Sequence, residues 1–100
     1  MSKINDMDNI TEHFTLIDGH FDPSGAKEVL VALVTEKINY HNRKNFSHEE
    51  RFGVPDQHSL ARIEQLKEAR RQLVDYLGRL DKSQELEVTS QIFVTVKQTA

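Results

Sequence analysis

The feature that most constrains the fold is a pair of long apolar stripes, separated by a polar stretch. From Ala26 to Ile38, and again from Leu60 to Leu80, apolar residues recur three and four positions apart. This spacing places each set on one side of a 3.6-residue helix. Two helices of similar length favour antiparallel packing, with a coiled-coil-like seam where three- and four-residue steps alternate. We therefore expect an antiparallel two-helix hairpin.

Local signals set the ends of the two expected helices. Asp22 can cap the first helix, and Pro23 suits its first position because proline lacks the N–H that would go unpaired there. Asp56 follows a proline and can cap the second helix. The polar residues after the first stripe and the turn-forming residues after the second indicate where each helix ends. The expected helices span residues 22–45 and 56–81.

The connection between the helices, residues 46–55, is expected to be an ordered loop. Ser47 is placed to cap a short helical turn, and a glutamate three residues later would complete a capping box. Phe46, Phe52 and Val54 are the apolar side chains that would hold such a loop in place.

The flanking segments read as extended chain. Residues 1–10 are polar and acidic and are expected to be mobile. Residues 11–21, in which Phe14 and Leu16 alternate with polar residues, predict an arm or short strand, and residues 85–97 alternate over a longer β-strand. The predicted fold is α+β, mainly α, in a single domain spanning the chain.

Two separate observations favour assembly into homo-oligomers. The hydrophobic content is 37%, below the roughly 45–50% of an average globular domain, so the core of one chain is thin. The C-terminal strand has only the short N-terminal strand as an intrachain partner, and an unpaired apolar edge invites another chain. We expect a dimer or a larger homo-oligomer.

Composition argues against several function classes. The chain has no cysteine, so it has neither disulfides nor a thiolate zinc site. Its net charge of −3 does not favour a nucleic-acid partner. Arg43, Lys44 and Arg51 nevertheless lie near phenylalanines that could stack on bases. No stretch is apolar for long enough to span a membrane, so we expect no membrane partner and a cytoplasmic location. No phosphate loop or nucleophile motif is present, so we expect a protein without enzymatic activity.

Three polar residues lie where the pattern expects apolar ones. Lys37 and Arg70 fall at the centres of the two helical stripes, and His41 follows one turn after Lys37. A buried cation must meet an anion or reach water. We hypothesise that Arg70 pairs with a carboxylate across an oligomer interface. Alternatively, Lys37, His41, Arg51 or Arg70 builds a site for an anionic ligand.

Histidines around the connection raise the question of a metal site. Two histidines and a carboxylate can ligate zinc, but His41, His48, Glu49 and His58 match no metal-binding spacing. We expect neither a metal nor a cofactor, and no catalytic residue.

The sequence thus favours a non-enzymatic, homo-oligomeric interaction module that displays the polar connection from Arg43 to Val54. The alternative is a small ligand-binding or regulatory protein. The candidate partner- or ligand-binding residues are Lys37, His41, Arg43, Arg51 and Arg70.

Overall fold

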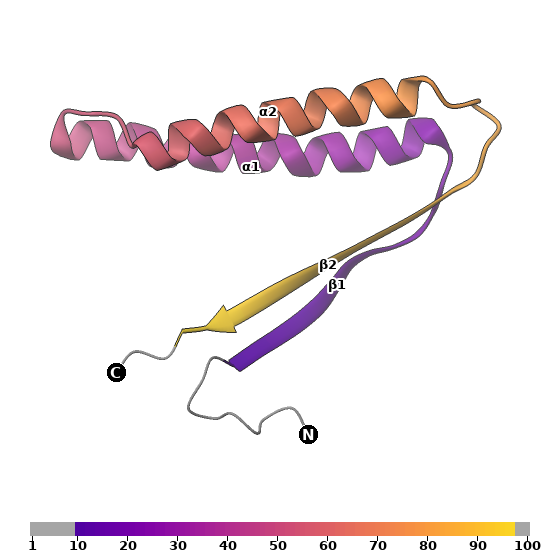
Figure 1. The fold of residues 1–100 in the computed structure, drawn as a ribbon, viewed down its shortest axis with the longest axis horizontal. Helices are drawn as coiled ribbons and strands as arrows, with labels where there is room; N and C mark the ends of the chain where they lie inside the picture. The colour runs from indigo at the N-terminus through magenta and orange to yellow at the C-terminus, as the bar shows by residue number, and fades with distance from the viewer. Residues whose placement is uncertain (1–9, 98–100) are drawn as a thin grey trace. The chain divides into compact units, whose positions relative to one another are not determined.

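A computed structural model describes residues 10–97 of the chain, which form the elements β1, α1, α2 and β2 in that order (Figure 1). The strands are β1 (Ile10–Phe21) and β2 (Leu86–Val96), and the helices are α1 (Pro23–Phe52) and α2 (Gln57–Gly78). The fold is α+β and mainly α, as the sequence predicts. It divides into a helical hairpin, residues 21–86, and a ribbon that pairs the two strands. The predicted mobile segment 1–10 lies, apart from Ile10, outside the described residues.

Helix α1 begins as its capping residue dictates. The Asp22 carboxylate accepts a hydrogen bond of 2.7 Å from the backbone N–H of Gly25, which satisfies one of the four N–H groups that a helix leaves free at its start. Phe21 packs against the same first turn, close to the Cα of Gly25. A hydrophobic side chain at this place fixes the angle at which the chain enters the helix.

The prediction that α1 ends at residue 45 is wrong, because the helix continues to Phe52. Residues 42–52 are polar, but they contain neither proline nor glycine, so nothing in them interrupts a helix. The chain turns only at Gly53, whose φ of 75° is left-handed and whose N–H donates to the Glu49 carbonyl at 2.8 Å. Ser47 therefore lies inside the helix and caps nothing.

Helix α2 begins after its predicted cap, Asp56, and ends at Gly78, three residues before the predicted end. A hydrogen-bonded turn follows, in which the Asp81 carboxylate accepts from the backbone N–H and the hydroxyl of Ser83, both at 2.9 Å. These bonds lower the pKa of Asp81. The turn leads the chain out of the hairpin into β2.

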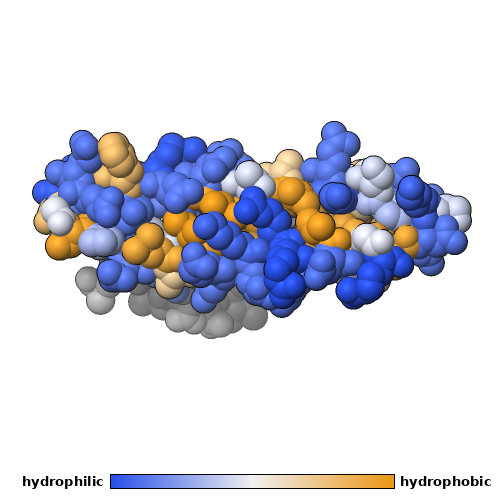
Figure 2. Space-filling model, turned by 90° about the horizontal axis from the view of Figure 1, so that it is seen from above, coloured by the Kyte–Doolittle hydropathy of each residue, from blue (hydrophilic) through white to orange (hydrophobic). Residues whose placement is uncertain are grey.

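The hairpin core lies between the two helices, which run side by side in opposite directions (Figure 1). Ile38, Ile63 and Leu66 form the buried cluster, with Val34 and Leu60 packed against it. Figure 2 shows further apolar side chains along the hairpin, between polar residues. Lys37, which the pattern places at the centre of the stripe, reaches water. Leu33, a member of the predicted stripe, is 40% exposed. The row of α1 that faces inward consists of the buried residues Ala26, Ile38 and His41 and the partly buried Leu30 and Val34.

The ribbon is a two-stranded antiparallel sheet. Its register follows from two facing pairs: the hydroxyls of Thr11 and Thr95 are 2.8 Å apart, and the rings of His13 and Phe93 are centred 5.6 Å apart. The N-terminal strand has 12 residues and begins one residue before the predicted arm or strand, residues 11–21. Each element of the ribbon alternates its side chains between two faces.

Candidate functional site

Two surfaces of the described chain expose large apolar side chains to solvent. The first, called the tip, is the end of the hairpin where α1 passes into α2. The second, called the apolar face, is one side of the ribbon. The two surfaces belong to separate compact units.

The tip is held by hydrogen bonds between side chains of α1 and the backbone of the connection. The Asn45 side-chain oxygen accepts from the backbone N–H of Asp56 at 2.8 Å. His48 Nδ1 lies 2.8 Å from the carbonyl oxygen of Val54, and a carbonyl can only accept, so Nδ1 carries the hydrogen. Both bonds join the last two turns of α1 to the chain that leaves it. They fix the short connection without help from apolar packing.

Asp56 closes the other side of the tip. Its carboxylate accepts from the hydroxyl of Ser59 at 3.0 Å and from the backbone N–H of Ser59 at 3.4 Å. Ser59 is fully buried. Burial alone would raise the pKa of Asp56, but the bonds from Ser59 and the charges of His48 and Lys44 outweigh it and lower the pKa below the usual 3.8. Asp56 is therefore ionised at neutral pH.

The apolar side chains of the tip point into solvent, contrary to the prediction that they hold the loop. Phe46 is 62% exposed, Phe52 61% and Val54 54%. The rings of His48 and Phe52 contact each other in a tilted arrangement, with their centres 4.7 Å apart. An open hollow of about 570 Å³ lies beside them, and its lining residues are Lys44, Phe46, Ser47, His48, Glu50, Arg51, Phe52 and Asp56.

The sequence-predicted binding residues do not gather at one place in the described chain. Arg51 lines the hollow at the tip. Arg43 pairs with Glu36 at 3.4 Å on the outer surface of α1. Lys37 is exposed, and its charge acts on His41, which is buried. Lys37 therefore lies near His41, whereas Arg43 is engaged by Glu36 and Arg51 lies at the tip.

Arg70 has a partner within its own chain. Its Nη1 donates to the Thr35 hydroxyl at 2.9 Å, from α2 across to α1. Thr35 is neutral, so this bond gives one guanidinium N–H a partner without cancelling the charge of Arg70. The pairing of Arg70 with a carboxylate of a second chain stays a prediction, and the side chain has an intrachain role in joining the helices.

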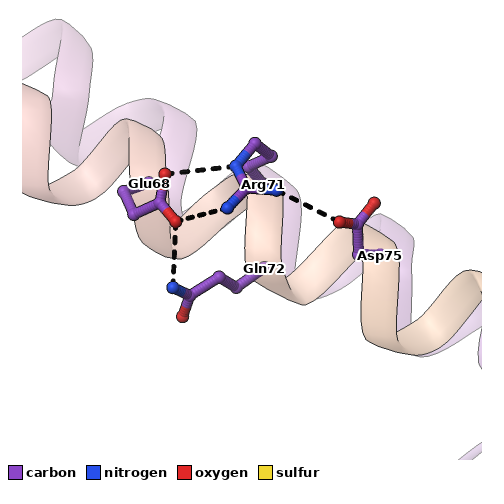
Figure 3. Close-up of polar contacts among 4 residues, drawn as sticks. All are labelled: Glu68, Arg71, Gln72 and Asp75. Carbon is purple, nitrogen blue, oxygen red and sulfur yellow. Dashed lines mark hydrogen bonds and ion pairs between the residues drawn. The ribbon is translucent and has the colours of Figure 1, made fainter.

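Charged side chains cluster on the outer surface of α2 (Figure 3). Arg71 donates to Glu68 through Nε at 3.1 Å and to Asp75 through Nη1 at 3.2 Å, and the Gln72 amide donates to Glu68 at 2.9 Å. Glu68 thus contacts the residues three and four positions later on the helix, where side chains are neighbours. Asp75 pairs with Arg71, four positions before it.

The histidines considered as metal ligands lie in different surroundings. His48 bonds the backbone at the tip, whereas His41 is buried between the helices. Over residues 10–97, no three histidine, aspartate or glutamate side chains lie in an arrangement that could hold a metal ion.

The apolar face is the side of the ribbon opposite the Thr11–Thr95 and His13–Phe93 pairs. Strand alternation places on it Phe14 and Leu16 of β1 with Ile92, Val94 and Val96 of β2. These five side chains are between 41% and 58% exposed. The sequence predicts the alternation of β2 but does not identify the residues of β1 that share its face, because register depends on pairing between distant segments.

No protein-family model, curated protein or solved structure matches the chain. Neither helix within residues 10–97 has the length and apolar character needed to cross a membrane. The two surfaces therefore have to be interpreted from their own geometry.

Proposed function

We propose that the chain is a non-enzymatic, homo-oligomeric interaction module of the cytoplasm. The ribbon joins copies of the chain, and the hairpin displays its tip to a protein partner. The observation that carries this proposal is the exposed apolar face: five large apolar side chains gathered on one side of a two-stranded sheet. Contiguous exposed apolar surface of this kind marks interaction sites.

A second copy is the occupant that fits the apolar face. A two-stranded ribbon is marginal in water by itself, and a second copy brings the same ribbon with the same need for cover. A two-fold interface uses one patch twice, so a self-complementary apolar surface suffices. Glu12 and Asp18 lie on the same face, on either side of Phe14 and Leu16. The register places Glu12 opposite Val94, so the uncharged part of the face is centred on Phe14 and Ile92.

The tip supports the display half of the proposal. Its hydrogen bonds through Asn45 and His48 fix the connection in one conformation. Phe46 and Phe52 are presented on that rigid base, next to the charges of Arg51 and other lining residues. Exposed aromatic side chains beside arginine are the residues that dominate binding energy at protein interfaces.

The proposal is tested by the solution mass, measured by light scattering on a sizing column over a range of concentrations. The wild-type chain is expected to be a dimer or larger, and the double variant Phe14→Ser, Ile92→Ser is expected to dissociate. Loss of two apolar contacts of about 1.5–3 kcal/mol each raises the dissociation constant by at least about a hundredfold. Phe93→Ser, on the opposite face of the same strand, is the matched control and is expected to assemble as the wild type does.

A wild-type chain that stays monomeric at every concentration would remove the basis of the assembly proposal. If Phe93→Ser dissociated as much as the double variant, the contact between copies would not be confined to the apolar face, and the proposal would be wrong. The helical signal of α1 and α2, followed by circular dichroism, checks that each variant keeps the hairpin.

The hollow at the tip favours a second candidate function, the binding of a small anionic ligand. Its volume of about 570 Å³ falls within the roughly 300–1,000 Å³ of ligand pockets, and Lys44 and Arg51 supply positive charge. A thermal-shift panel of inorganic phosphate and nucleotides tests it, because a ligand at 100 times its dissociation constant adds about 2.7 kcal/mol of stability. A shift that Arg51→Gln abolishes would support this function, and no shift across the panel would count against it.

A further inference from the structure

A buried histidine in the hairpin interface has no polar partner. His41, on α1, is 6% exposed and lies one turn after the core residue Ile38. Neither ring nitrogen has a hydrogen-bond partner within the described chain. A neutral imidazole carries one donor and one acceptor, and leaving both unpaired in the interior is unfavourable. Burial without a polar partner is much less favourable for the charged imidazolium than for the neutral imidazole.

The charged neighbours of His41 oppose protonation further. On α1 these are Lys37 and Lys44, and on α2 they are His58 and Arg62. All four are basic. Tyr40 contacts the imidazole edge-on with ring centres 5.1 Å apart, and contributes an aromatic ring without a charge. Burial is the main reason that the pKa of His41 lies below 6.5, and these four groups lower it further.

We propose that His41 makes the hairpin an acid-sensitive device: α1 and α2 pack together while the imidazole is neutral, and its protonation separates the helices near the tip. The added proton comes from solvent and stays on a ring nitrogen. Because that nitrogen is buried between the helices, the charged ring reaches water only when α2 moves away from α1. The rigid connection that presents the tip would be released by the same movement.

The direction of the pH effect follows from linkage. The unfolded chain has a histidine of ordinary pKa, 6.5, and the folded chain has one below it. Below pH 6.5 the unfolded state therefore binds more protons, so stability falls as the pH falls. The unfolding equilibrium constant rises by up to about tenfold per pH unit until the folded pKa is reached.

The experiment is urea unfolding at fixed protein concentration from about pH 8 to about pH 5, the range in which histidines titrate. The wild-type unfolding constant is expected to rise steeply below pH 6.5, and His41→Phe, which keeps a ring of similar size in the core, is expected to flatten that rise. His20→Gln, at an exposed position of the ribbon, is the matched control and is expected to keep the wild-type response. A His41→Phe variant with the full wild-type slope would overturn the proposal.

A second measurement on the unmodified chain covers the case in which His41→Phe does not fold. Nuclear magnetic resonance follows the titration of the His41 ring and the hydrogen exchange of amides in both helices. The proposal requires the ring to titrate below 6.5, with faster exchange near the tip as it does so. Titration at or above 6.5, or exchange that does not respond to acid, would refute it.

Discussion

In the hairpin, Ile38, Ile63 and Leu66 are at most 9% exposed, whereas in the ribbon Phe14 and Ile92 remain more than 40% exposed. The difference arises from geometry. Two helices can bury a stripe of each against the other, but a two-stranded sheet has no second layer of its own, and Ile17 is the buried apolar side chain of its described strands. The hairpin therefore closes its own core, whereas the ribbon keeps an apolar surface exposed to solvent.

This comparison separates two kinds of stability. Residues between α1 and α2 contribute to unfolding of a single chain, so their effect does not depend on protein concentration. Under the proposed assembly, residues on the apolar face contribute through contacts between copies, so their effect grows with protein concentration by mass action. Variants in the two regions are expected to differ in this dependence even where the deleted side chains are the same size.

The largest expected effect comes from the hairpin core. Ile38→Ala removes a side chain that is 4% exposed and packed on Ile63 and Leu66, and such a cavity costs about 2–5 kcal/mol. Leu33→Ala, on the same helix but 40% exposed, is the control and is expected to cost about 1 kcal/mol or less. Urea denaturation at two protein concentrations measures both. Ile92→Ala, on the apolar face, is measured in the same way. If the destabilisation by Ile38→Ala depended on protein concentration as strongly as that by Ile92→Ala, the distinction between the two regions would be wrong.

The next effect concerns the turn that lets the helices meet. Gly53→Ala keeps the backbone in a left-handed conformation, which costs about 1–2 kcal/mol for a residue with a Cβ. An added Cβ would meet no atom within 4 Å, so the lost stability comes from the strained backbone conformation and not from a steric clash with a neighbour. Gly78→Ala, at a helical position that is equally open, is expected to stabilise by up to about 1 kcal/mol. Thermal denaturation should show opposite shifts, and shifts of the same sign would contradict this explanation.

A smaller effect is expected at the tip. Asn45→Ala leaves the Asp56 backbone N–H without the partner that now lies 2.8 Å away, which costs about 0.5–1.5 kcal/mol. Asn42→Ala, at an exposed position one turn earlier on the same helix, is the control. Hydrogen exchange of the Asp56 amide should accelerate in the first variant and not in the second. Unchanged exchange in both would show that the connection is held in another way.

The spacing of apolar residues was enough to predict both helices and the α+β class. Asp22, Pro23 and Asp56 predicted where the helices begin, because each of these signals lies within a few residues. It did not identify which side of α1 meets α2. The run from Val29 to Val34 covers more than one side of a helix, so Lys37 and Ile38 were each compatible with the interface. In the structure Ile38 and His41, three residues apart on one side of the helix, are the buried pair, whereas Lys37 is exposed.

The sequence predicted where the candidate site lies in the chain, but it did not predict the hydrogen bonds that hold it together. Polar composition around residues 41–58 drew attention to the tip, yet it also suggested a loop where the helix continues to Phe52. The bond from Asn45 to Asp56 joins residues eleven positions apart and leaves no pattern in the sequence. The apolar face depends on strand register, which is set by contacts between segments about 80 residues apart.

The smallest effect is expected from the ion pairs on α2, drawn in Figure 3. The side chains of Glu68 and Arg71 are 51% and 61% exposed, so water and salt screen their attraction. Arg71→Gln should lower the melting temperature by less than Asn45→Ala does, and Arg79→Gln, an exposed arginine near the end of the same helix, is the control. A loss as large as that of Ile38→Ala would mean that surface charge, and not the core, holds the hairpin.

The pH dependence of this cluster sharpens the same point. Hydrogen bonds from Arg71, and then from Gln72, lower the pKa of Glu68 below its usual 4.5. A carboxylate of lowered pKa stabilises the folded chain above 4.5, and that contribution is lost as the pH falls through the folded pKa. Glu68→Gln should therefore diminish only the loss of stability below pH 4.5, whereas His41→Phe should diminish only the loss that begins below 6.5. Urea unfolding across both pH ranges distinguishes the two contributions. The buried His41 changes stability below pH 6.5, and the exposed Glu68 changes it below pH 4.5. If Glu68→Gln altered the upper window, the two groups would be coupled through α2, and the core and surface of the hairpin could not be treated as independent.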